Sequence, residues 1–120
     1  MRQTGPVLMF ALLVATLPDP GGAAKAASAS WIDCVHAAAK PGMDAVTPPD
    51  DVAEAALAAC KPALERFERE ALLAHRLVGH DEPTALARSA LLVEESRASL
   101  KQRVATMVRA YRRVAPSLPE

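Results

Sequence analysis

The spacing of apolar residues in the second half of the chain constrains its fold more than any other feature. Two segments carry apolar side chains at alternating steps of four and three residues, which is the period of a helix with one buried face. Arg97 is the only polar member of these two stripes. The stripes consist of Ala53, Leu57, Cys60, Leu64, Phe67, Ala71, Ala74 and Val78, and of Leu86, Ala90, Val93, Arg97, Leu100, Val104, Met107 and Tyr111.

A turn sequence, Gly79-His80-Asp81-Glu82-Pro83, separates the two stripes. Helices are therefore predicted over residues 48–78 and 84–114, and a short turn between matched helices indicates an antiparallel hairpin. Pro62 lies in the middle of the first of these helices. Because proline removes a backbone hydrogen bond and clashes with the carbonyl four residues earlier, this helix is expected to kink or break near Pro62.

The first 24 residues have the pattern of a signal peptide. Arg2 precedes an uncharged apolar run over residues 7–17, which is shorter than the roughly 20 residues of a membrane-spanning helix. Helix-breaking and then small residues follow, so cleavage is expected between residues 24 and 29, after Ala24, Ala26 or Ala29. The alternative is an uncleaved N-terminal anchor helix.

Cleavage would leave a helical domain over residues 30–115 and a disordered tail over residues 116–120. The mature protein is then expected to be periplasmic or secreted, with no stable membrane anchor. Its core must be modest, because the chain is rich in alanine and poor in aromatic residues, and each alanine contact buries little area.

The chain has two cysteines, Cys34 and Cys60, and two cysteines in an exported chain predict one disulfide. Cys34 lies in a short helix predicted over residues 30–40, which Ser30 can cap and Pro41-Gly42 ends. The Cα atoms of the two cysteines are expected to lie about 4.4 to 6.8 Å apart. The predicted fold class is therefore all-α, a short helix joined by a disulfide to a long antiparallel hairpin, as a three-helix bundle.

The chain has 14 basic and 14 acidic side chains, and this balance does not favour nucleic acid as a partner. Acids are concentrated at the start of the second predicted helix and bases at the end of the third. An antiparallel hairpin brings these two ends together, so most of the asymmetry is expected to be satisfied within the chain; the alternative is contact with an acidic partner or anionic lipid. The side chains concerned are Asp50, Asp51 and Glu54, and Arg109, Arg112 and Arg113.

No motif in the chain specifies a reaction or a cofactor, so we expect neither an enzyme nor a cofactor. The histidines and acids of the hairpin turn are weak metal candidates, since they offer nitrogen and oxygen ligands close together. They are His75, His80, Asp81 and Glu82. His36 is expected to lie about 25 Å away along the helix axis and cannot join them, so a polar turn without a metal is the favoured interpretation.

The predicted register places Arg97 at the level of Trp31 and Phe67. A charged group at that level must reach solvent or find a partner. Arg97 is therefore expected to stack on the Trp31 ring or to pair with Glu65 or Glu68, and the alternative is that its side chain extends past the edge of the core into solvent. If this layer is partly open, Trp31, Arg97 and Phe67 form the candidate contact surface for a protein partner.

Two resemblances bear on function. The sequence Ser30-Trp31-Ile32-Asp33-Cys34, with the later Val46-Thr47-Pro48 and Ala59-Cys60, loosely resembles the small acid-activated periplasmic chaperones, which are exported, all-helical and held by one disulfide. The W-x-x-C and A-A-C elements are also similar to those of uncharacterised small exported proteins of high-GC proteobacteria. The favoured function is a non-enzymatic interaction or structural module of the cell envelope with an unidentified protein partner, and the alternative is an acid-activated periplasmic chaperone.

Overall fold

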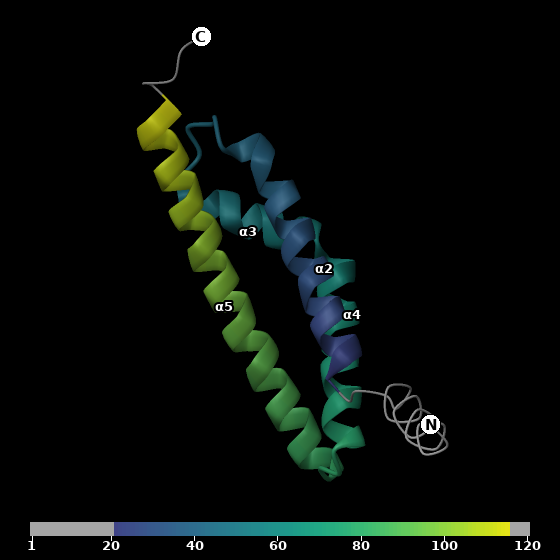
Figure 1. The fold of residues 1–120 in the computed structure, drawn as a ribbon. Coiled ribbons are helices and arrows are strands. Elements are labelled where there is room, and N and C mark those ends of the chain that lie inside the picture. Colours follow the sequence, from purple (N-terminus) through teal and green to yellow (C-terminus); the bar gives the residue numbers. More distant parts are fainter. Residues whose placement is uncertain (1–20, 116–120) are drawn as a thin grey trace, which may run out of the picture.

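The computed structural model describes residues 21–115, which fold into helices without any β-strand in that segment (Figure 1). The predicted all-α class is therefore confirmed. The elements are α2 (Gly22–Ala39), the short 3-10 helix η1 (Lys40–Gly42), α3 (Pro49–Ala59), α4 (Lys61–Leu77) and α5 (Glu82–Val114). The apolar run of the predicted signal peptide and the predicted tail lie outside the described residues.

The helices form an open frame (Figure 1). α4 and α5 meet at the hairpin turn and diverge from it, α2 lies along α4, and α3 crosses over to α5. Four α-helices are thus present in the described segment, where three were expected. The break that produces the extra helix places α3 against α5 and α4 against α2.

The first helix begins eight residues earlier than predicted. α2 starts at Gly22, whereas Ser30 was expected to cap it. Residues 23–29 consist mainly of alanine, the residue with the highest helix propensity, so nothing in them stops the helix. Ala27, in this added part, is 1% exposed and belongs to the core.

The predicted break near Pro62 is confirmed. Cys60 has a non-helical backbone conformation (φ −106°, ψ 26°) that ends α3 and precedes α4. Pro62 occupies the first turn of α4, where its missing N–H has no intrahelical partner to lose. The residues from Cys60 to Pro62 therefore divide the single predicted helix into two helices, α3 and α4, which pack against different neighbours.

The predicted disulfide is also confirmed. Cys34 and Cys60 are bonded, with Cα atoms 6.0 Å apart, and the bond joins α2 to the junction of α3 and α4. Trp31 and Phe67 stack beside it with ring centroids 5.7 Å apart. Both aromatic side chains are buried, so this stacked pair is part of the core.

The predicted apolar stripe of α5 is wrong in its first half. Ala85 and Ser89 are the buried residues there, whereas Leu86, expected inside, is half exposed. Small side chains allow α4 and α5 to approach closely near the turn, and Ala71 of α4 is likewise buried. In the second half of α5 the buried residues include Leu100 and Val104, as predicted.

The loop between η1 and α3 is held by the end of α5. The Arg112 guanidinium donates hydrogen bonds to the carbonyls of Met43, Gly42 and Thr47, at 3.2, 3.1 and 2.7 Å. Gly42 also lies so close to α3 that a Cβ atom there would come within 2.6 Å of Val52 Cγ1. The loop is therefore held by packing against α3 and by hydrogen bonds from α5.

Reducing the disulfide is expected to destabilise the domain. The bond closes a loop with a sequence separation of 26 residues, which in the chain-entropy model corresponds to about 3.5 kcal/mol. Urea unfolding followed by circular dichroism, with and without reductant, measures this difference. The Cys34→Ser/Cys60→Ser protein is the matched control, because reductant should not change its unfolding midpoint; equal stability of oxidised and reduced protein would contradict the expectation.

Candidate functional site

The structure does not bring Trp31, Phe67 and Arg97 together as one surface. Trp31 and Phe67 are buried in the core, whereas Arg97 is exposed on α5. Its guanidinium lies 3.7 Å from the Glu54 carboxylate of α3, and not beside Glu65 or Glu68 as expected. The physical reason is the break at Cys60: α3 leaves the line of α4 and places its own acidic side chain against α5.

Glu54 is the centre of the ionic contact between α3 and α5. Lys101 Nζ lies 2.9 Å from its carboxylate, and the Arg97 guanidinium lies on the same group. The hydrogen bond from Lys101, with the positive charges of Lys101 and Arg97, lowers the pKa of Glu54, and the same contact raises the pKa of Lys101. The side chains of Glu54, Arg97 and Lys101 are 39–47% exposed, so solvent screens their charges and the contact contributes only modestly to stability.

The other predicted charge contacts between α3 and α5 are only partly formed. Arg109 lies 3.4 Å from Asp50, as expected from the antiparallel hairpin. Arg112 instead holds the loop carbonyls described above. Asp44 accepts a hydrogen bond from the Tyr111 hydroxyl, which raises the pKa of Tyr111.

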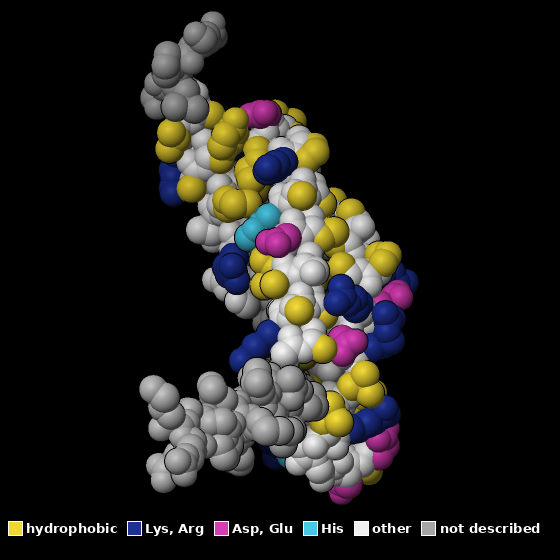
Figure 2. Space-filling model, turned by 45° about the vertical axis from the view of Figure 1, so that its right-hand side comes forward, with side chains coloured by type: hydrophobic (Ala, Val, Ile, Leu, Met, Phe, Trp, Pro, Cys, Tyr) yellow, Lys and Arg dark blue, Asp and Glu magenta, His cyan; other side chains and the backbone are white. Residues whose placement is uncertain are grey.

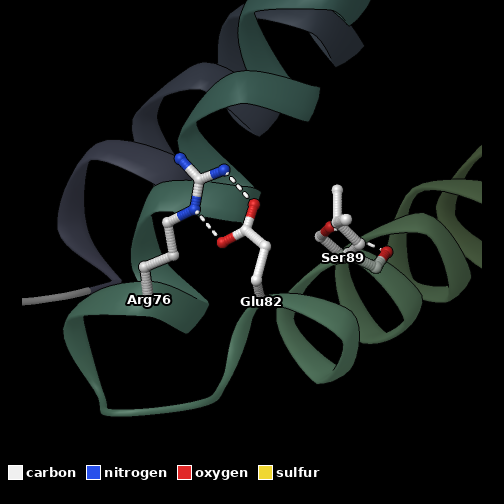
Figure 3. A network of polar contacts seen from close by, with 4 residues as sticks. Arg76, Glu82 and Ser89 are labelled. Carbon is white, nitrogen blue, oxygen red and sulfur yellow. Dashed lines mark hydrogen bonds and ion pairs between the residues drawn. The ribbon is translucent and has the colours of Figure 1, made fainter.

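Polar contacts close the hairpin turn, and its two acidic residues, Asp81 and Glu82, take part in them. Arg76 and Glu82 point toward each other across the turn and form a two-point ion pair (Figure 3), which lowers the pKa of Glu82 and raises that of Arg76. Asp81 caps α5 by accepting a hydrogen bond from the Thr84 amide, 3.0 Å away, which lowers the pKa of its carboxyl. Gly79 supplies the positive φ (93°) of the turn.

These contacts occupy the carboxylates that would be needed to bind a metal ion at the turn. His75 and His80 lie side by side, with ring centroids 5.4 Å apart, but Asp81 and Glu82 are engaged in the cap and the ion pair. Between residues 21 and 115 no group of three or more histidine, cysteine or acidic side chains is placed to hold a metal. The turn residues therefore act as a structural closure of the hairpin.

An open groove runs between α4 and α5 near the turn. It has a volume of about 320 Å³ and is lined by Glu68, Leu72, Leu86, Ser89, Ala90 and Val93. Leu86, Ala90 and Val93 are three successive members of the stripe that the sequence predicted to be buried. The Ser89 hydroxyl beneath them donates to the Leu86 carbonyl at 3.2 Å (Figure 3), so its polar group is satisfied within the helix.

Further leucines are exposed around this end of the hairpin. Leu77 is 69% exposed on α4 and Leu91 is 59% exposed on α5. Figure 2 shows that hydrophobic side chains reach the surface between charged ones along the molecule. The sequence analysis missed this surface because it assigned the apolar stripe of α5 to the core. The small side chains of Ala85 and Ser89 could have indicated that this other face of α5 packs against α4.

Comparisons with models of protein families, with curated proteins and with solved structures found no match. In the described part of the chain, none of the helices combines the length and apolar character needed to cross a membrane.

Acidification is expected to weaken the contact between α3 and α5. Because the pKa of Glu54 is lowered in the folded protein, its ionised form stabilises the fold at neutral pH, and this contribution is lost as the pH falls through its ordinary value toward the lowered one. Urea unfolding at pH 7 and at pH 3.5 should therefore show a smaller pH-dependent loss for Glu54→Gln than for the unmodified protein. Glu65→Gln, an exposed acid on α4, is the control and should behave as the unmodified protein. Equal pH dependence in all three proteins would contradict the expectation.

Proposed function

We propose that the chain is an exported, non-enzymatic interaction module of the cell envelope, and that its contact surface is the groove between α4 and α5. The observation that carries this proposal is the position of Leu86, Ala90 and Val93. These residues have the four-and-three spacing of a helix-packing seam, yet they line an open groove.

The groove suits an amphipathic helix of another protein. Two antiparallel helices present apolar side chains on its two walls, which is the arrangement that accepts a third helix. Glu68 is the one charged residue among those that line it. A partner helix with apolar residues on one face and a lysine or arginine at its edge would match this lining in shape and charge.

α2 does not provide this third helix within the chain. The last turns of α4 and the first turns of α5 extend beyond the start of α2 (Figure 1). The hairpin end therefore keeps leucines exposed that a longer bundle would cover. A surface of this kind on a small domain is typical of a protein–protein contact.

Photo-crosslinking in the producing cell tests the contact surface. A crosslinking amino acid at Ala90, in the groove, is expected to give a discrete adduct with one envelope protein, whereas the same group at Gln102, exposed on α5 outside the groove, should give none. Leu86→Glu should remove the Ala90 adduct because it places a charge on the apolar wall. An adduct of equal yield at both positions, or one that survives Leu86→Glu, would overturn the proposed surface.

Export rests on the signal-peptide pattern and is supported by the disulfide, which persists in oxidising compartments. The burial of Ala27 in α2 favours some of the expected cleavage sites over others. Cleavage after Ala29 would remove Ala27 from the core, and cleavage after Ala26 would leave Ala27 as the terminal residue with no helical residue before it. Cleavage after Ala24 keeps Ala27 inside α2.

We therefore expect the mature chain to begin at Lys25. Intact-mass measurement of the oxidised protein purified from the envelope or the medium determines the first residue directly. A chain beginning at Ser30 would show that Ala27 is dispensable, and an uncleaved chain would support the anchor-helix alternative.

The chaperone alternative is distinguished by its behaviour in acid. The lowered pKa values of Glu54 and Glu82 indicate that helix contacts are lost as these carboxylates become protonated. An acid-activated chaperone should expose more apolar surface near pH 3 and suppress aggregation of an unfolded client there. The proposed module should bind its partner at neutral pH and show no such gain of activity in acid.

A further inference from the structure

A second concave region lies between α2 and α5 and shares no lining residue with the groove between α4 and α5. α2 packs along α4 and α3 but scarcely touches α5. Two adjoining hollows of about 370 and 270 Å³ remain between these two helices. They share four lining residues, Ser28, Ile32, Leu92 and Ser96, so together they form one elongated site, here called the α2–α5 hollow.

The larger part of the α2–α5 hollow is apolar. Ile32, Phe67 and Leu92 form its walls, with the small residue Ala29 beside them. Leu92 is well exposed although it stands on this wall. An acyl chain or another slender apolar group lying here would cover Leu92 without displacing a core side chain.

The smaller part carries the polar groups. The hydroxyl residues Ser28, Ser96 and Ser99 line it, and Trp31 and Arg103 contribute to the same lining. Trp31 is 1% exposed, and its indole N–H is the one fully buried side-chain polar group of residues 21–115 without a hydrogen-bond partner. Buried indole N–H groups ordinarily have an acceptor, and the Trp31 side chain that carries this unpartnered donor lines the smaller part of the hollow.

The charges around the α2–α5 hollow favour an anion. Lys25 lies at the larger part and Arg103 at the smaller part, against Glu95 alone. Arg103 stands at the same part as the unpartnered indole and the serines. A carboxylate there would receive hydrogen bonds from a guanidinium and neutral donors, the combination that binds such groups most strongly.

We propose that the α2–α5 hollow binds a single-chain anionic amphiphile, such as a medium-chain fatty acid. Its apolar chain lies along Ile32, Phe67 and Leu92, and its carboxylate lies at Arg103, Ser99 and Trp31. This site is separate from the proposed protein contact, and the two can be tested independently because they share no residue.

Trp31 is the only tryptophan of the chain, so its fluorescence reports directly on this site. Titration of the purified oxidised protein with dodecanoate, below the concentration at which it forms micelles, is expected to change the Trp31 emission saturably, with a dissociation constant below about 100 µM. Dodecyltrimethylammonium, with the same chain and the opposite charge, should bind at least about tenfold more weakly. Equal affinity for the two amphiphiles would overturn the proposal.

Variants locate the bound molecule. Arg103→Ala is expected to weaken dodecanoate binding about tenfold, whereas Arg88→Ala, an exposed arginine of α5 outside both sites, should leave it unchanged. Ser99→Leu places a larger side chain into the hollow at an exposed position and should abolish the fluorescence response without altering the helical circular dichroism. Binding that survives Ser99→Leu, or that depends on Lys25 and not on Arg103, would overturn the proposed placement.

The same chemistry can reach the protein as a free fatty acid or as part of a membrane lipid. Vesicles of phosphatidylglycerol mixed with phosphatidylcholine form the second arm of the titration. Because the hollow has room for one slender chain, dodecanoate should change the emission and vesicles should not. A response to vesicles alone would overturn the proposal in favour of a membrane-surface contact, and Leu86→Glu should affect neither arm.

Discussion

The disulfide between Cys34 and Cys60 determines how the four helices are arranged. Cys60 is the non-helical residue between α3 and α4, so the bond attaches α2 to a corner and not to the side of a straight helix. From that corner α2 contacts both α3 and α4. The stacked Trp31 and Phe67 side chains lie beside the bond and supply much of the apolar area that alanines cannot.

A second constraint is the small size of the buried residues in the parts of α4 and α5 that lead to the hairpin turn. Ala71, Ala85 and Ser89 allow α4 and α5 to approach closely, and this turns the larger side chains of the same helices outward. α4 and α5 lie close together at the turn and diverge further along, where α3 crosses from α4 to α5. This arrangement leaves concave surfaces between the helices. The same alanine-rich composition that limits the core therefore produces the grooves that can bind other molecules.

Much of the fold could be predicted from the sequence, because its signals are local or covalent. Proline in mid-helix, glycine in the turn and two cysteines in a chain with a predicted export signal each have one dominant structural meaning. The start of α2 was misplaced because a capping serine was weighted above a run of alanines. The buried face of α5 was misplaced because periodicity identifies an apolar face but does not say which residues the neighbouring helix approaches.

The candidate sites were harder to predict for the same reason. The expected pairing of Arg97 assumed that one register holds along the whole hairpin, and the break at Cys60 sets a different register for α3, which places Glu54 beside Arg97. Neither the groove between α4 and α5 nor the hollow between α2 and α5 has a sequence motif. Both arise from the angles between helices, which depend on the packing of the whole chain.

The contact of Arg112 with the loop after η1 links the C-terminal end of α5 to the connection between α2 and α3. It joins residues 65 to 70 positions apart in the sequence, from the last turn of α5 to the carbonyls of Gly42, Met43 and Thr47. The loop between α2 and α3 therefore cannot take its final form until nearly the entire chain is available. Under the export that we propose, the chain would cross a membrane unfolded, and its folding would be completed only after the C-terminal helix had emerged on the far side.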